Sequence, residues 1–165
     1  ISIEEMERLI NNGLEKVNDL SIRTTLMVGF PTETEQDFKK LLKLIEKGYF
    51  HHLGVFKYSH EDNIKSYSLG DMVDEEVKEE RRNILMEAQQ KISLQKNKAM
   101  VGQIQKVLLE GEYEETDLLL KGRNKYQGPE VDGLVLVNEG VGLSGQFSDI
   151  MVTEAYPYDV IGRII

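Results

Sequence analysis

The sequence predicts a mixed fold, an α/β part followed by a small all-β barrel. Within residues 21–58 a strand, a helix and a second strand follow one another, each marked by its own hydrophobic spacing. After Gly102 the chain changes to short β-type runs separated by Gly, Asn and Asp. A long helical segment joins the two parts. We therefore expect two domains, residues 1–101 and 102–165.

Composition limits the kinds of function open to this chain. Its 165 residues include no Cys and three His, and its net charge is −9. Without thiolates it can hold neither a disulfide nor an iron–sulfur cluster, and we expect no metal site. No apolar run reaches the roughly 18 residues that a membrane span needs, and the acidic start lacks the features of a signal peptide, so we expect a cytoplasmic protein. The negative charge suits a basic protein partner better than a phosphate backbone.

The first elements are predicted from capping and periodicity. Ser2 with Glu5 forms a capping box that starts a helix through about Leu14. A strand is expected over 21–30, where consecutive apolar residues indicate cover on both faces. Thr34 then caps a second helix, with Asp37 three residues later, and Gly48 ends it.

A second strand is expected over 52–58, so that strand, helix and strand make one βαβ unit with parallel strands and a right-handed crossover. Asp74 caps a long helix that continues to about Met100. Six residues are expected on its buried side: Val77, Ile84, Leu85, Ala88, Ile92 and Ala99.

The five β-type runs of the second part predict a small OB-like barrel. They are spaced by turn residues at short intervals, which is typical of an all-β domain. The predicted strands cover residues 103–110, 117–121, 133–137, 147–155 and 159–164.

Three stretches carry residue types suited to binding or chemistry. In 28–34 a strand ends at Gly29 and a helix begins at once, and the free N–H groups of that helix could bind an anion. In 58–62 His60 stands beside two acids and could transfer protons, since His titrates near neutrality. The loop 122–133 holds two cations, an aromatic ring and two acids. Each also suits a plain structural connection, and we assign no catalytic residue.

These stretches, in this order, resemble radical-SAM methylthiotransferases. Residues 23–34 resemble a late strand of the barrel of those enzymes, and 55–61 resemble the next strand and its rim loop. Residues 122–133 resemble the signature of their C-terminal TRAM domain, an OB-like barrel. The resemblance implies the C-terminal portion of a partial (β/α) radical-SAM barrel, including the long connecting helix, followed by a five-stranded antiparallel TRAM barrel.

Within the family the resemblance is to the RimO type, which adds a methylthio group to an aspartate of a small-subunit ribosomal protein. The MiaB type, which modifies a tRNA adenosine, carries Tyr-Ser-Pro-Arg where this chain has Tyr58-Ser59-His60-Glu61. From Val101 on, the chain has eleven Asp or Glu and five Lys or Arg, a difference of six negative charges. This acidity favours a basic ribosomal protein over tRNA. A tRNA methylthiotransferase and a non-enzymatic protein- or RNA-binding module remain alternatives.

The resemblance also implies cofactors, S-adenosylmethionine and two 4Fe–4S clusters in the full-length protein. The family holds the clusters with cysteines upstream, and because this chain has none, we expect the segment alone to be inactive. By resemblance, one group of residues forms part of the wall around the adenosyl group: Val28, Gly29, Phe30, Glu33, Val55 and Phe56. A second group, on the TRAM loop, contacts the ribosomal protein: Arg123, Glu130 and Asp132.

The chain departs from the family pattern at the two rim stretches. Thr32 replaces the second Gly of Gly-Phe-Pro-Gly-Glu-Thr, and Asp62-Asn63-Ile64 stands where the rim loop usually continues Glu-Gly-Thr. These differences leave the shape of the rim loop open.

Overall fold

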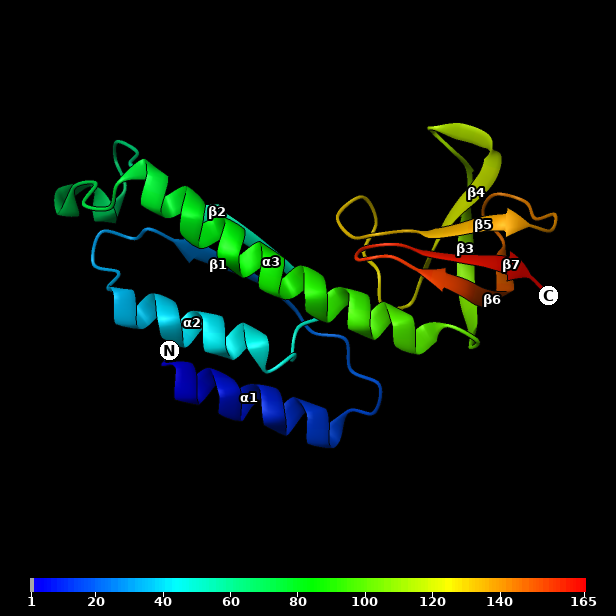
Figure 1. Ribbon diagram of the computed structural model, residues 1–165, viewed down its shortest axis with the longest axis horizontal. Coiled ribbons are helices and arrows are strands. Elements are labelled where there is room, and N and C mark those ends of the chain that lie inside the picture. The colour runs from blue at the N-terminus through cyan, green and yellow to red at the C-terminus, as the bar shows by residue number, and fades with distance from the viewer. Residues whose placement is uncertain (1) are drawn as a thin grey trace. The chain divides into compact units, whose positions relative to one another are not determined.

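A computed structural model describes residues 2–165, and Figure 1 shows its elements in chain order. Clustering of contacts divides the chain into two compact units, one up to Ile92 and one from Ser93. The first part comprises α1 Ile3–Lys16, β1 Arg23–Val28, α2 Glu35–Glu46, β2 His52–Lys57, the 3-10 helix η1 Lys65–Leu69 and α3 Glu75–Met100. The barrel comprises β3 Ile104–Tyr113, β4 Thr116–Asn124, β5 Val135–Glu139, β6 Phe147–Ala155 and β7 Val160–Ile164.

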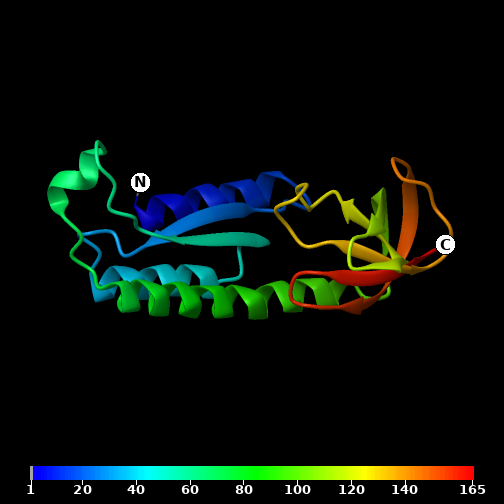
Figure 2. The ribbon, with the colours of Figure 1, turned by 90° about the horizontal axis from the view of Figure 1, so that it is seen from above.

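The βαβ unit of the first part is confirmed. Strands β1 and β2 pair in parallel, with Leu26 opposite Val55 and Met27 opposite Phe56. Parallel neighbours need a crossover, and α2 supplies it. Helices α2 and α3 lie on the same side of the two strands (Figure 2). The carboxyl ends of both strands therefore meet at one rim, near Gly29 and Tyr58.

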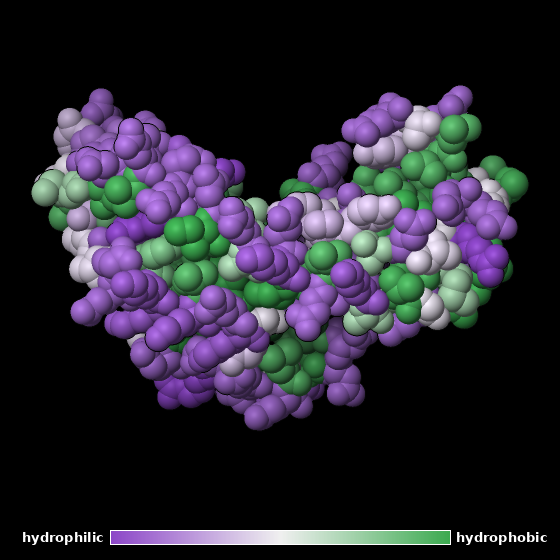
Figure 3. Space-filling view, in the orientation of Figure 1, coloured by the Kyte–Doolittle hydropathy of each residue, from purple (hydrophilic) through white to green (hydrophobic). Residues whose placement is uncertain are grey.

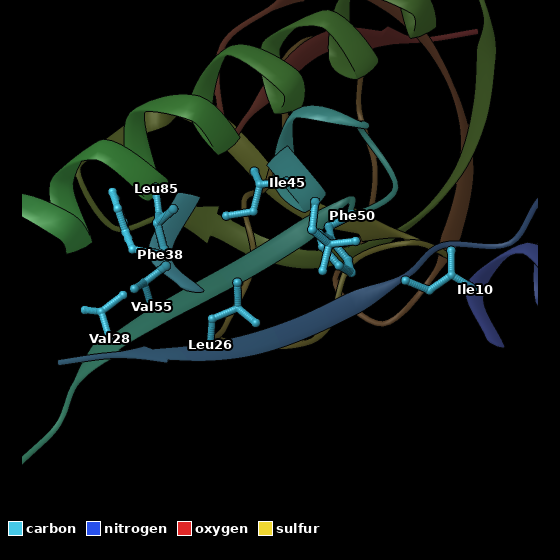
Figure 4. Packing of buried hydrophobic residues seen from close by; sticks show 9 residues of the cluster. Ile10, Leu26, Val28, Phe38, Ile45, Phe50, Val55 and Leu85 are labelled. Atoms are coloured by element: carbon cyan, nitrogen blue, oxygen red, sulfur yellow. The ribbon is translucent and has the colours of Figure 1, made fainter. Parts of the chain in front are cut away.

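The core of the first unit lies between the sheet and these helices. Side chains at alternate strand positions, Leu26, Val28 and Val55, pack against Phe38 of α2 and Leu85 of α3 (Figure 4). The residues between them point the other way, and Met27 and Phe56 are exposed. The expectation that the strand at 21–30 is covered on both faces is wrong for the described residues, because Arg23, Thr25 and Met27 on its other face are exposed.

Both predicted capping boxes are present. In α1 the Glu5 N–H donates to Ser2 Oγ, and Ser2 N–H donates to Glu5 Oε2. In α2 the Asp37 N–H donates to Thr34 Oγ1, and the Thr34 N–H and hydroxyl both donate to Asp37 Oδ2. These bonds hold the pKa of the Asp37 carboxyl below its usual value.

Most of the predicted apolar side of α3 is confirmed, because Leu85 is fully buried and Ile84, Ala88 and Ile92 pack against the same core. Ala99 is exposed, contrary to the expectation. The other buried residues of the helix are polar or charged: Lys78, Arg81, Gln89 and Ser93. They recur at helical spacing with Leu85, so one face of α3 buries charge and amide groups against the sheet and α2. Gln89 donates to the carbonyl oxygen of Phe50 at 3.2 Å.

The second unit contains the predicted five-stranded barrel, closed in the order β3-β4-β5-β7-β6. Four of its strand pairs are antiparallel, but β5 and β7 are parallel, so the fully antiparallel barrel was wrong in this detail. The reason is geometric. An odd number of strands cannot alternate in direction around a closed ring, and one neighbouring pair must be parallel. Small apolar side chains fill the interior: Val107, Leu109, Val135, Val137, Ile150, Val152 and Val160.

Within residues 2–165 no helix combines the length and apolar character that crossing a bilayer requires.

Two salt bridges join β2 to α3, and they predict that the stability of the first unit depends on pH. Lys57 Nζ lies 2.5 Å from Glu75 and 2.8 Å from Glu79. Its hydrogen bonds lower the pKa of both carboxyls, and theirs raises the pKa of Lys57. The carboxyl contribution to stability is therefore complete above their unfolded pKa, about 4.5, and is lost as pH falls through the lower folded values. The lysine contribution is complete below about 10.5 and is lost as pH rises further.

We expect Lys57→Met to lower the urea midpoint at about pH 7 and to have a smaller effect at about pH 3, where a larger share of the glutamate carboxyls is protonated. Urea titrations at the two values measure this. Lys39→Met, which removes an exposed pair with Glu35, is the matched control and should change little at either pH. An equal loss for Lys57→Met at both pH values would contradict the prediction.

Candidate functional site

A tight turn at the carboxyl end of β1 is the centre of the candidate site. Gly29 has a φ of +79°, in the left-handed region that favours glycine. The next four residues form a turn closed by the Glu33 N–H, which donates to the carbonyl oxygen of Phe30 at 2.7 Å. The chain thus reverses between the strand and α2 with its backbone close to the rim.

The Glu33 carboxylate fixes this turn from inside. Its Oε2 accepts from the Gly29 N–H at 3.0 Å, and its Oε1 accepts from Arg81 Nη1 at 2.6 Å. Arg81 also donates to Glu35 at 3.3 Å, and its guanidinium lies 5.3 Å from the ring centroid of Phe38. The side chains of Arg81 and Glu33 are each only 10% exposed. Glu33 therefore ties the turn to α3, and both of its oxygens are occupied.

The structure argues against an anion bound at the start of α2. The capping box already satisfies the N–H groups of Thr34 and Asp37, and the first turn carries Glu35 and Asp37. Two acids in the first turn repel a further negative charge. The capping box and the two acids therefore disfavour the anion site expected at this helix end, which stays a prediction.

The side chain of Lys78 on α3 packs against Gly29. Its stem packs so closely that a Cβ on Gly29 would lie 2.4 Å from Lys78 Cγ. Its ammonium, almost fully buried, lies 2.7 Å from Asp71 and 3.6 Å from Glu75. The same lysine therefore covers the turn and holds the segment that leads into α3.

Gly29→Ala tests this packing. We expect it to lower the free energy of unfolding by about 2 kcal/mol, because Ala is strained at positive φ and its methyl group would displace Lys78. Chemical denaturation of the variant measures the loss. Gly29→Ala should cost less in a Lys78→Ala background than in the wild type, because the methyl group and the lysine stem compete for one space. An equal cost in both backgrounds would contradict the explanation.

The rim after β2 is built from stacked rings. Tyr58 is buried, meets Phe30 edge-on with 5.4 Å between ring centroids, and donates its hydroxyl to Ser66 at 3.1 Å. His60 stacks on Tyr67 with centroids 4.6 Å apart. His60 is thus engaged in ring packing at the edge of the rim.

The residues expected around the adenosyl group lie in three different settings. Val28 and Val55 point into the core, whereas Gly29 and Phe30 form the rim turn. Phe56 lies on the open face of the sheet, beside exposed Met27 in the opposite register position. Gly54, two residues before Phe56, has no side chain on that face. A Cβ there would make only ordinary van der Waals contacts, at 3.8 Å.

The loop 122–133 of the barrel separates its three predicted residues. Arg123 Nε donates to Glu110 at 2.7 Å, and Asp132 Oδ2 accepts from the Gly128 N–H at 2.6 Å, which closes the loop. Glu130 is exposed and has a φ of +62°. Of the three, only Arg123 lines a hollow on the barrel surface that the structure describes.

That hollow is a groove of about 620 Å³ across β3, β4 and β6. Asn124 fixes one side, because its side chain accepts from the Tyr126 N–H at 3.0 Å and its own N–H donates to Gln127. Three of the five Lys or Arg residues from Val101 on line the groove, together with two aromatic rings. The lining residues are Ile104, Gln105, Lys106, Leu108, Arg123, Asn124, Lys125, Tyr126 and Phe147.

Lys78 and Arg81 are the site residues that the sequence reasoning missed. Both lie on a segment rich in Glu and Lys, which suggests a solvated surface. Their helical spacing could have identified them. Positions 78, 81 and 89 lie on the same helical face as Leu85, so the polar residues there belong to the buried side.

Known proteins resemble this chain over nearly its whole length. The TRAM domain model matches residues 101–165. A protein of Syntrophotalea carbinolica named ribosomal protein uS12 methylthiotransferase RimO is 45% identical over 95% of this chain and 34% of its own length. Proteins of the same name from Aquifex aeolicus and Desulfotalea psychrophila are 46% and 41% identical, over 96% and 98% of this chain and 37% and 36% of their own.

The chain spans about a third of the length of these curated relatives. The resemblance inferred from the three motifs is confirmed, and so is the choice of the RimO type among its subgroups. The matched TRAM domain covers all five strands of the barrel.

Proposed function

We propose that this chain, which resembles several RimO proteins over nearly its whole length, is the C-terminal part of a ribosomal protein uS12 methylthiotransferase. The sequence identity of 41–46% to three such proteins is the observation that carries the proposal. An enzyme acting on a ribosomal protein would work in the cytoplasm.

In this proposal the rim of β1 and β2 forms part of the S-adenosylmethionine pocket. Gly29 and Phe30 would approach the adenosyl group at the rim, and Phe56 would offer its exposed ring on the open face. Val28 and Val55 would support this wall from the core, and Glu33 would hold the turn rather than touch the ligand. The electron for reductive cleavage would come from one 4Fe–4S cluster held outside this chain, which has no Cys to ligate it.

The barrel would recognise the protein substrate through Arg123, Glu130 and Asp132. Glu130 stands exposed at the loop, while Asp132 and Arg123 are held by Gly128 and Glu110. The excess of six acids from Val101 on supports a basic protein and disfavours tRNA, because a ribosomal protein that binds RNA carries many Lys and Arg.

One observation favours a second candidate, an RNA partner for the barrel. The groove gathers three cations with Tyr126 and Phe147, which is a combination that single-stranded nucleic acids bind. Filter binding of tRNA to the full-length protein at increasing salt separates the two candidates. Tight binding that falls steeply with salt and disappears in Lys106→Glu would support RNA and contradict a protein partner.

The proposal is tested with the full-length protein carrying reconstituted clusters. We expect formation of 5′-deoxyadenosine from S-adenosylmethionine under reducing conditions, and we expect Phe56→Ser to raise the KM for S-adenosylmethionine about tenfold. Leu9→Ser, an exposed apolar residue on α1, is the control. A wild-type protein without this cleavage, or with no cluster-binding cysteines upstream, would overturn the proposal.

A further inference from the structure

The segment between β2 and α3 exposes several large apolar side chains close together. Four of them fall within residues 64–72: Ile64, Tyr67, Leu69 and Met72. Ile64 and Tyr67 also line a hollow of about 510 Å³, together with Asp62, Asn63, Lys65 and Ser68. Figure 3 shows apolar side chains among hydrophilic ones over this segment, at the left edge of the view. We call residues 59–74 the rim segment.

The rim segment is held in place by its own contacts. Ser66 accepts from the Tyr58 hydroxyl at 3.1 Å, and Tyr67 stacks on His60. Asp71 is bound at 2.7 Å by the buried ammonium of Lys78. Its apolar side chains are therefore presented on an ordered scaffold, which lowers the entropy cost of binding.

The charge around these side chains is negative. The rim segment has one Lys, Lys65, and three acids besides Asp71: Glu61, Asp62 and Asp74. Asp71 is neutralised by Lys78. An apolar surface bordered by unneutralised acids complements a chain segment that carries both Lys or Arg and apolar residues.

The rim segment lies next to the carboxyl end of β2. Tyr58, the residue before it, touches Phe30 of the β1 turn. In α/β folds ligands bind at the carboxyl ends of the strands. Tyr67 belongs to the same rim, because it stacks on His60, two residues after Tyr58.

We propose that the rim segment docks a basic stretch of the protein substrate, with its apolar residues against Ile64, Tyr67 and Met72. This inference rests on the proposed function and extends it, because the substrate would be held beside the reaction centre as well as by the barrel. The occupant is the ribosomal protein itself, selected by charge complementarity.

The test uses the full-length protein with labelled uS12. Ile64→Ser with Met72→Ser leaves the anchors Ser66, Tyr67 and Asp71 intact and removes side chains that are 41% and 72% exposed. The matched control is Leu9→Ser with Leu14→Ser, whose side chains are 66% and 41% exposed on α1. We expect the first pair to weaken uS12 binding about tenfold and to raise the KM for uS12 equally, with unchanged substrate-free S-adenosylmethionine cleavage and unchanged melting.

Charge is tested separately with Glu61→Gln and Asp62→Asn, which should weaken uS12 binding and reduce its salt dependence. Binding within twofold of wild type for the Ile64 and Met72 pair, or an equal loss for the control pair, would overturn the docking proposal. A wild-type protein that binds uS12 without modifying it would contradict the proposed function, while the binding comparison still decides the role of the rim segment. A wild-type protein that does not bind uS12 overturns both.

Discussion

Replacing Gly133 with Ala is expected to destabilise the barrel by about 3 kcal/mol or more, which would leave much of it unfolded near physiological temperature. A Cβ at this position would lie 1.7 Å from the carbonyl oxygen of Tyr158 and 2.4 Å from its carbon. Both are backbone atoms, so no rotamer change relieves the clash. The Leu134 N–H donates to Asp159 at 2.7 Å, and the Val160 N–H donates to the Leu134 carbonyl, so the two segments cannot separate cheaply.

Thermal melting followed by near-ultraviolet circular dichroism reports on this loss, since the barrel contains Tyr residues near the site. Gly54→Ala is the control, because its new methyl group would meet atoms only at 3.8 Å and its backbone is compatible with Ala. A Gly133→Ala protein as stable as Gly54→Ala would show that Tyr158 can move away and that the contact is not needed.

Arg81→Met is expected to destabilise the first unit by about 3 kcal/mol, because it leaves the nearly buried Glu33 carboxylate without its charged partner. Arg81 donates to Glu33 at 2.6 Å and to Glu35 at 3.3 Å, and Met fills similar space without donating. Because Glu33 in turn holds the Gly29 N–H, we also expect weaker S-adenosylmethionine binding if the proposed pocket is correct.

The matched control is Arg82→Met, one residue along α3, where the partner Glu79 and the arginine are both well exposed. Its loss should stay below about 1 kcal/mol. Glu33→Gln and the double variant complete a cycle, and the double variant should be less destabilised than the sum of the single ones. Additive effects, or equal losses at Arg81 and Arg82, would refute the role of this pair.

The elements of the fold were predictable because their signals are local. Both capping boxes, at Ser2 and Thr34, depend on residues three positions apart, and both are formed. The five β-type runs became the five barrel strands. The parallel pair β5 and β7 was predictable too, since a closed ring of five strands requires one, but the short runs alone carry no direction.

The site was harder to predict because its contacts join distant parts of the chain. Arg81 and Glu33 are 48 residues apart, and nothing in the local sequence links them. Strand alternation places Val28 and Val55 on the core face and Phe56 on the other face. The sequence alone does not say which of the two faces is buried, because both carry apolar residues. The groove likewise combines three strands with the loop residues Lys125 and Tyr126.

The central claim is that this chain belongs to an enzyme that adds a methylthio group to uS12. Mass spectrometry of uS12 and of tRNA after incubation with the reduced full-length protein and S-adenosylmethionine tests it most directly. We predict a methylthio group on one aspartate of uS12 and none on tRNA, with the modification abolished by Arg81→Met and kept by Arg82→Met. Methylthio-adenosine in tRNA with unmodified uS12, or no methylthio group on either, would contradict the claim.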